Sequence, residues 1–308
     1  MLRPLAGLLL IALVTSGCGN GEPPGASAST ASPARADGAA PPYRFDAPTA
    51  QFELPGRLDE ISGLTALDGD RLGAVQDEDG VLYVIDAATG EVTHEHDFGK
   101  DGDYEGVERV GERVVVLRSD GELAVIEDWQ AEKARAPTLD PGLHGSCDAE
   151  GLGYDADAAR LLIACKESPG RGLRGVRAVY AFDLATNTLD PEPAFVIAAE
   201  SLAASDGERA VDETVRALVR PLVDINTFKP SALGVHPVTG EVYVLSSVRK
   251  ALAVLDRAGS VTAVWPLPER LLPQPEAIAF FPDGTLFLAS EADGDAARLL
   301  RYDYQPAR

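Results

Sequence analysis

Five short segments of the chain carry an oxygen-bearing side chain at the same position of a repeated pattern. Each segment begins with a polar or charged residue and ends with an apolar one; they are 60–64, 103–107, 148–152, 229–233 and 274–278. The third residue of each is a serine or a glutamate: Ser62, Glu105, Glu150, Ser231 and Glu276. Carboxylate and hydroxyl oxygens are the ligands that hard divalent cations such as Ca²⁺ and Mg²⁺ prefer. If the fold brings the segments together, these side chains form a ring that can bind such an ion.

The first residues of the same segments face the same way in an extended strand, because side chains alternate with a period of two. They are Glu60, Asp103, Asp148, Lys229 and Gln274. Carboxylates this close raise one another's proton affinity unless a cation compensates them. We therefore predict that Glu60, Asp103 and Asp148 join the ring as further metal ligands, opposed by Lys229 alone. The alternative is a metal-free ring in which the carboxylates bind neighbouring backbone N–H groups and Lys229.

Other residue patterns offer less for chemistry. The histidines are scattered and form no ligand set with the cysteines, which argues against zinc; they are His94, His96, His144 and His236. No catalytic residue is assigned. A metal-dependent hydrolase would need a base within reach of the metal, and the candidates for this base are Asp77, Glu78 and Glu167.

The spacing of the segments indicates the fold that positions them. They recur every 43 to 45 residues, with one longer interval of 81 residues before Ser231. Each is followed by short apolar strands separated by turn signals such as Asp79-Gly80 and Thr239-Gly240. Units of this length are typical of four-stranded propeller blades, whose first strands line a central channel. We predict an all-β protein, a five-bladed β-propeller over residues 51–308.

The end of the chain predicts how the ring closes. Blade five lacks room for a fourth strand, because the sequence ends at Arg308 soon after its third. The segment 51–54 is strand-like and precedes the first repeat. We expect it to complete blade five and so remove an open sheet edge.

The long interval holds an insertion at about 199–228, between blades three and four. Apolar residues at helical spacing mark one face of it: Val211, Val215, Leu218, Val219 and Leu222. A short helical insertion that packs across one end of the propeller explains the pattern, and a lid over the channel mouth is the alternative.

The N-terminal region has the form of an export signal. One basic residue, Arg3, precedes an apolar run that is too short to span a bilayer, and small residues lead to Cys18. Thr15 to Cys18 resembles a lipoprotein box, so residues 1–18 are predicted to be a lipoprotein signal with Cys18 lipidated; a plain signal peptide is the alternative. Residues 19–50, rich in Gly, Pro, Ala and Ser, are predicted to be a disordered tether.

Two further cysteines, Cys147 and Cys165, remain after Cys18 is assigned to lipid. They fall on the first two strands of blade three, nearly equidistant from the turn between them. In an oxidising compartment such a pair forms a disulfide or stays as two buried thiols.

Taken together, these motifs resemble the SdiA-regulated family of exported bacterial propellers. The resemblance rests on the segments 60–64, 105–106, 150–152, 164–167, 230–231, 274–276 and 289–291. It implies a five-bladed propeller and a calcium site, with no established enzymatic activity. By resemblance to Gram-negative lipoproteins, Gly19 after Cys18 favours the outer membrane of the cell envelope, facing the periplasm or the exterior.

Charge narrows the function further. The net charge is −22, and residues 51–308 carry all of the acidic excess, which argues against nucleic-acid binding. Contact with the membrane is then expected through the lipid alone. We expect a monomeric, non-enzymatic binding module that takes a small ligand or an envelope protein, with Ca²⁺, or Mg²⁺, in the channel. The alternative is a metal-dependent hydrolase of the lactonase or phosphoesterase type.

Overall fold

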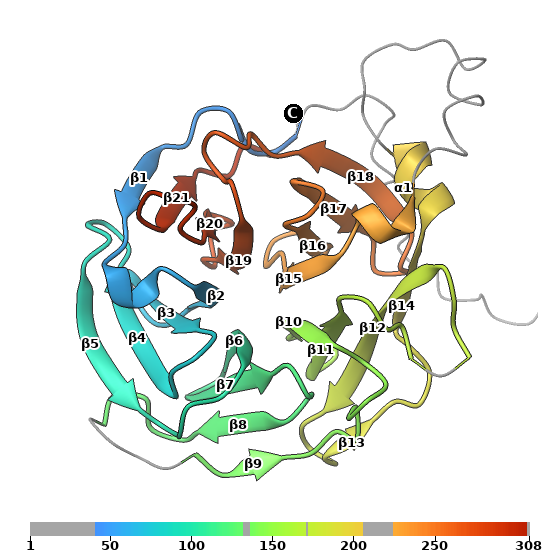
Figure 1. Cartoon of the computed structure of the whole chain (residues 1–308), viewed down its shortest axis with the longest axis horizontal. Helices are drawn as coiled ribbons and strands as arrows, with labels where there is room; N and C mark the ends of the chain where they lie inside the picture. The colour runs from blue at the N-terminus through green and yellow to red at the C-terminus, as the bar shows by residue number, and fades with distance from the viewer. Residues whose placement is uncertain (1–40, 132–135, 171, 206–223, 307–308) are drawn as a thin grey trace, which may run out of the picture. The chain divides into compact units, whose positions relative to one another are not determined.

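The computed structural model of the chain describes residues 41–131, 136–170, 172–205 and 224–306. These residues form five antiparallel sheets arranged around a centre (Figure 1). The five-bladed propeller predicted from the repeat is therefore confirmed, and its inner strands β2, β6, β10, β15 and β19 surround the channel.

Blades one and two follow the same meander from the channel outward, because each strand pairs with the next along the chain. Blade one contains β2 (Ile61–Ala66), β3 (Arg71–Gln76), β4 (Val81–Asp86) and β5 (Val92–Asp97). Blade two contains β6 (Tyr104–Val110), β7 (Arg113–Arg118), β8 (Leu123–Ile126) and β9 (Thr138–Leu139).

Blade three differs because its outer strand is split into two pieces that both pair with the third strand. It contains β10 (Ala149–Asp155), β11 (Arg160–Cys165), β12 (Val176–Asp183), β13 (Thr188–Leu189) and β14 (Phe195–Ala198). Blade four is regular, with β15 (Pro230–Val235), β16 (Val242–Ser246), β17 (Ala251–Leu255) and β18 (Val261–Pro266).

Blade five closes the ring with a strand from the other end of the chain. It contains β19 (Pro275–Phe280), β20 (Leu286–Ser290), β21 (Arg298–Tyr302) and β1 (Ala50–Glu53). Strand β1 pairs antiparallel with β21, with Ala50 opposite Arg301, as the lack of a fourth C-terminal strand predicted (Figure 1).

The insertion between blades three and four is only partly described. Helix α1 (Ala199–Ser205) packs against β14 and β18 at the outer edge of the ring, and a 3-10 helix, η3 (Ile225–Thr227), precedes β15 (Figure 1). The predicted helical face at 211–222 lies outside the described residues, as do the predicted signal 1–18 and Cys18. A second short 3-10 helix, η1 (Gly56–Leu58), follows β1. Within the described ranges, no helix is long and apolar enough to cross a bilayer.

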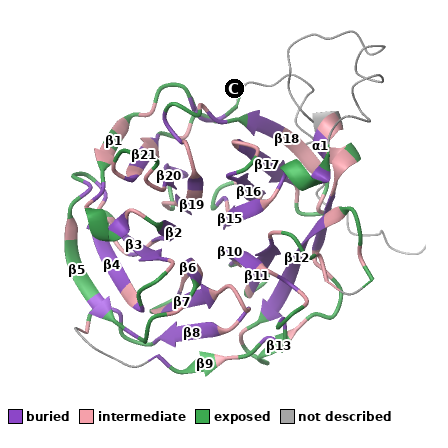
Figure 2. Ribbon diagram, viewed as in Figure 1, coloured by how far each residue is buried: buried purple, intermediate pink, exposed green. Residues whose placement is uncertain are grey.

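The hydrophobic core lies between neighbouring blades rather than at the centre. Five clusters of buried side chains each combine residues of two adjacent blades, so the ring is held by five similar interfaces. Buried residues accordingly lie along the strands of every blade (Figure 2).

The folded domain begins earlier than the composition suggested. Tyr43 is 0% and Phe45 6% exposed, and both pack in the cluster between blades four and five. The predicted tether therefore does not run to residue 50, because these two aromatic side chains bury enough apolar surface to fix residues 41–49 on the propeller.

Candidate functional site

The five ring residues occupy the same irregularity in each blade. The pairing of every inner strand with the second strand of its blade shifts at the third motif residue, which marks a β-bulge. The bulged residues are Ser62, Glu105, Glu150, Ser231 and Glu276, called here the inner ring. A bulge leaves one residue outside the ladder and re-aims its side chain, so all five blades present this position alike.

Small residues after the inner ring hold the strands close together. A Cβ added to Gly63 would lie 2.9 Å from the Gly106 Cα, and one added to Gly106 would lie 2.9 Å from the Leu152 Cβ. Neighbouring inner strands can approach this closely only without a side chain there. The channel is consequently narrow, and the cavity beside Ser62 and Glu105 measures about 10 Å³, room for roughly one water molecule or ion.

The two serines of the inner ring link their blades to the next ones. The Ser62 hydroxyl donates to the Tyr104 carbonyl at 2.6 Å, and the Ser231 hydroxyl donates to the Pro275 carbonyl at 2.9 Å. The hydrogen of the Ser62 hydroxyl is thus engaged with the backbone, whereas the Ser231 hydroxyl also lies within hydrogen-bond reach of the Glu276 carboxyl. A glutamate at this position makes no such donation when ionised, so the carboxylates are the members with acceptor capacity to spare.

A second ring, which the sequence analysis did not recognise, surrounds the inner one at the same end of the channel. It consists of the residue directly after the second strand of each blade: Asp77, Ser119, Lys166, Ser247 and Glu291. Backbone N–H groups position them; those of Asp77 and Lys166, for example, donate to the carbonyls of Glu60 and Asp148. The signal was present in the sequence, because antiparallel pairing brings the end of each second strand next to the start of the first.

The positive charge at this end comes from a residue other than the one predicted. The Lys166 ammonium lies 2.9 Å from Glu150 Oε1, whereas Lys229 pairs with the exposed carboxylate of Glu167. The expectation that Lys229 alone opposes the ring is therefore wrong. Lys229 precedes its strand at the rim, where the Glu167 carboxylate is within reach.

The inner-ring glutamates hold their protons more tightly than ordinary carboxyls. Burial, together with the nearby Glu150 and a hydrogen bond with Asp103, raises the pKa of Glu105 to about 10. Burial raises the pKa of Glu150 to about 7, although Lys166 opposes this rise, and burial also raises the pKa of Glu276 against hydrogen bonds from Ser247 and Ser231. Burial is thus the main cause of the tighter proton binding, and the mutual repulsion predicted from the sequence adds to it at Glu105 and Glu150.

Further carboxylates gather at the mouth of the channel. Burial and the charges of Glu276, Asp77 and Glu60 raise the pKa of Glu291 to about 7. Burial and the charge of Glu60 also raise the pKa of Asp77, whose Oδ1 atom is buried with no hydrogen-bond partner in the described part of the chain. Of the candidate bases, Asp77 is thus activated, whereas the contact with Lys229 lowers the pKa of Glu167.

The oxygen atoms at this end are the type of ligand that a hard cation prefers, but they do not converge on one point. Every candidate ligand is an oxygen, and the orphaned Asp77 oxygen lacks a partner. Within residues 41–131, 136–170, 172–205 and 224–306, however, no group of three or more His, Cys, Asp or Glu side chains converges closely enough to hold a metal. Binding would therefore require the glutamates to rotate toward one another, with Glu150 leaving Lys166.

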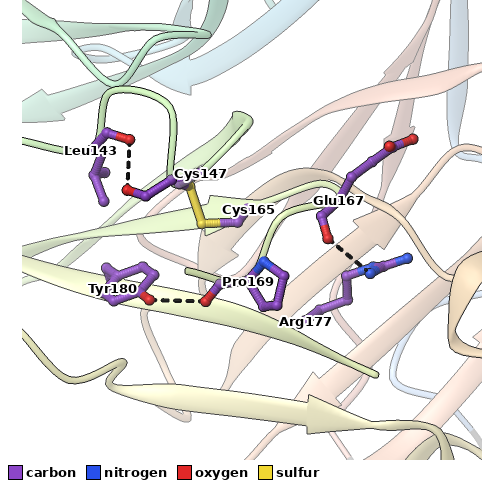
Figure 3. Close-up of a disulfide and its surroundings, with 8 residues drawn as sticks. Leu143, Cys147, Cys165, Glu167, Pro169, Arg177 and Tyr180 are labelled. Atoms are coloured by element: carbon purple, nitrogen blue, oxygen red, sulfur yellow. Dashed lines mark hydrogen bonds between the residues drawn. A yellow bond between two sulfur atoms is a disulfide. The ribbon is translucent and has the colours of Figure 1, made fainter. Parts of the chain in front are cut away.

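A disulfide braces blade three beside this site. Cys147 and Cys165 are bonded, with their Cα atoms 5.3 Å apart, and both are buried (Figure 3). Cys147 directly precedes Asp148, and Cys165 directly precedes Lys166. The bond therefore ties the start of the first strand to the end of the second, where both rings draw their blade-three members.

Comparison with known proteins places the fold. A family model described as SdiA-regulated matches residues 38–293. Among solved structures, the chain is similar to a glutaminyl cyclase from Myxococcus xanthus, at 14% identity and a TM-score of 0.56 over 85% of this chain and 97% of that one. A comparison with curated proteins finds none that matches this sequence.

Two further propellers are similar at 13% identity and a TM-score of 0.48. A luciferin-regenerating enzyme aligns over 82% of this chain and 95% of its own, and the PQQ-bound aldose sugar dehydrogenase of Streptomyces coelicolor over 83% and 99%. At such identities the likeness concerns the propeller fold alone.

Proposed function

The chain belongs to the SdiA-regulated family, and we propose from this premise that it is an exported, lipid-anchored propeller that binds Ca²⁺ at the acidic end of its channel. Its role is that of a binding module rather than an enzyme, and its ligand is a small molecule or an envelope protein. The lipid at Cys18 holds it in the cell envelope, at the outer membrane, and the acidic fold keeps it off nucleic acids.

One observation carries the calcium proposal. The inner ring holds three carboxyls, of Glu105, Glu150 and Glu276; Glu150 is buried and the other two are half-buried. Among the described residues, the ammonium in direct contact with them is that of Lys166, on Glu150, and Lys250 acts on Glu276 from a distance. A divalent cation with oxygen ligands relieves such repulsion better than protons do, and Mg²⁺ would demand a stricter octahedral geometry than a flexible ring of bulged strands offers. The unpartnered Asp77 oxygen at the mouth supplies a further acceptor.

The experiment is a calcium titration of the purified propeller after chelation. Because the ion binds the folded ring and hardly the open chain, calcium should raise the melting temperature with its concentration. Glu105→Gln should abolish this response at little cost to the metal-free protein, since Glu105 is already protonated at neutral pH. Glu78→Gln, an exposed change near the rim, is the matched control. If the wild-type protein contains no stoichiometric calcium and its melting temperature does not change with the chelator, the ring is a metal-free set of hydrogen-bonded carboxyls.

A hydrolase remains the second candidate because of Asp77. A carboxylate with a raised pKa and a free oxygen at a channel mouth can act as a general base next to a bound metal. A panel of lactones and phosphoesters tests this. Turnover that Asp77→Asn removes while calcium binding persists would favour the enzyme, and absence of turnover across the panel would favour the binding module.

A further inference from the structure

The opposite end of the channel holds a larger cavity. Its volume is about 570 Å³, within the range of small-molecule sites, and all five blades contribute to it where their inner strands end. Thr65, Glu108, Tyr154, Val235 and Phe280 line it, one from each blade. Because the inner strands start at the acidic end, this cavity and the two carboxylate rings lie at opposite ends of the same strands.

The arginines of this cavity are already engaged. Arg257 contacts Asp157 and lies 3.6 Å from Asp155 Oδ1. Arg109 donates to the carbonyls of Leu67 and Gly111. Neither guanidinium is available as the main partner of an anionic ligand.

Glu108 also lines this cavity, and it takes part in none of these ion pairs. Its carboxylate accepts from the Thr65 hydroxyl and from the Tyr154 backbone N–H, and no lysine or arginine among the described residues forms an ion pair with it. A carboxylate has about four acceptor sites, so roughly two remain. Burial raises the pKa of Glu108 to about 8, as expected for a carboxyl without a counter-ion.

Part of the cavity wall is apolar. Ile278 and the rings of Phe280 and Tyr154 line the cavity, and Val238, at its edge, is 57% exposed. Val238 is one of only three large hydrophobic side chains exposed within the described ranges. A ligand with an apolar body would cover it, and aromatic faces near a carboxylate also attract a cation.

We propose that this cavity binds a small organic amine, with its ammonium group on Glu108 and its apolar body against Ile278, Phe280 and Val238. The ammonium supplies the counter-ion that the protein lacks, and its hydrogens fit the acceptor sites left on the carboxylate. A carboxylic acid would meet Glu108 with like charge, and a neutral alcohol would leave it uncompensated. The acidic surface of the protein adds a general attraction for cations.

The test compares three probes of similar shape by calorimetry at about pH 9, where Glu108 is ionised and the amine is still largely protonated: phenethylamine, phenethyl alcohol and hydrocinnamate. The amine should bind at least about tenfold more tightly than the alcohol, and the acid should not bind measurably. Glu108→Gln should abolish the preference for the amine over the alcohol, whereas Glu112→Gln, an exposed carboxylate at the same rim, should keep it.

A second variant covers the case in which Glu108→Gln misfolds. Val238→Lys changes an exposed side chain, so the fold should survive; loss of the apolar contact should weaken both ligands, and repulsion from its ammonium should weaken the amine more than the alcohol. Equal affinities for amine and alcohol in the wild type, or no binding of either, would overturn the proposal. Calcium binding at the other end should be unchanged in both variants, so the two proposals can fail separately.

Discussion

The two ends of the channel are built from the same five strands but treat charge in opposite ways. At the acidic end, glutamates of the inner ring lie near one another, and Lys166 is the ammonium that contacts them. At the end with the larger cavity, called here the wide end, Arg257 lies against Asp155 and Asp157, and among the acidic residues described there Glu108 is left without a basic partner. The acidic end therefore carries unbalanced negative charge, whereas at the opposite end most carboxylates are balanced by nearby arginines.

This difference follows from which residue each blade places at equivalent positions. The bulge and the small residue after it, glycine in blades one to three and alanine in blades four and five, fix where the ring lies. The side chains at these positions are free to vary, so repulsion at the acidic end is a property of the chosen residues rather than of the fold. Uncompensated buried carboxyls cost stability, and they are more typical of binding sites than of structural cores.

The two ends are also braced by different means. The disulfide between Cys147 and Cys165 ties blade three at the acidic end. At the wide end, the Tyr43 hydroxyl donates to the Gly284 carbonyl and accepts from His236 Nε2, which fixes the N-terminal segment to blades four and five. His236 Nδ1 in turn accepts from the N–H groups of Val238 and Thr239.

The largest effect should come from the brace at the wide end. Tyr43→Ala removes a fully buried ring from the cluster between blades four and five and should lower the free energy of unfolding by about 3–5 kcal/mol. Tyr43→Phe, which removes only the hydroxyl, should cost about 1–2 kcal/mol. Denaturant unfolding of both variants measures this. Phenethylamine binding should weaken, whereas the calcium response should persist; loss of both would show that the two ends are not independent.

A smaller effect is expected from the ion pair at the acidic end. Lys166→Met leaves Glu150 buried beside other carboxyls without its counter-ion. The metal-free protein should lose about 1–3 kcal/mol of stability, less than for a fully buried pair, because the lysine side chain is a third exposed. Lys229→Met, whose partner Glu167 is exposed, should change stability by less than about 1 kcal/mol. Thermal unfolding with and without calcium compares them.

Calcium should recover more stability in Lys166→Met than in the wild type, since the ion then replaces the missing ammonium. If the two lysine variants were equally stable without metal, Lys166 would not be the counter-ion of the ring.

The fold was predictable because its repeat is marked by local features. The motif spacing and the glycine turns indicated blades, and the missing last strand indicated that 51–54 closes the ring. The early start of the domain was not predictable in the same way. Tyr43 and Phe45 stand among prolines and alanines, and only the tertiary structure shows the pocket between blades four and five that buries them.

Only the inner ring of the acidic site could be predicted from the sequence motifs. The inner ring follows from the motif phase, but the second ring depends on the register between the first and second strands, which a motif alignment does not contain. Lys166 was therefore overlooked and Lys229 overestimated. The wide cavity gave no sequence signal, because its equivalent positions hold unlike residues: Thr65, Glu108, Gly153, Gly234 and Ala279.

Changes in stability that are small at each pH step distinguish the two ends by titration. The pKa values of Glu105, Glu108 and Glu150 are raised to about 10, 8 and 7 from the ordinary 4.5, so the folded protein holds more protons than the unfolded chain above pH 4.5. Their contribution to stability is therefore complete below pH 4.5 and is lost as the pH rises through these folded values. Each group contributes a slope of at most about 1.4 kcal/mol per pH unit, reduced by its partial exposure.

In the presence of chelator, the free energy of unfolding of the wild type should fall from pH 5 to about pH 10. Of these three glutamates, only Glu105, at the acidic end, contributes to the fall above pH 8. Glu108→Gln should flatten the curve below pH 8 but leave the slope above it, because Glu105 still titrates there. Glu105→Gln should remove the slope above pH 8. Denaturant unfolding at a series of pH values measures both curves. Identical slopes above pH 8 in Glu105→Gln and wild type would mean that the pKa of Glu105 is not raised in the folded protein.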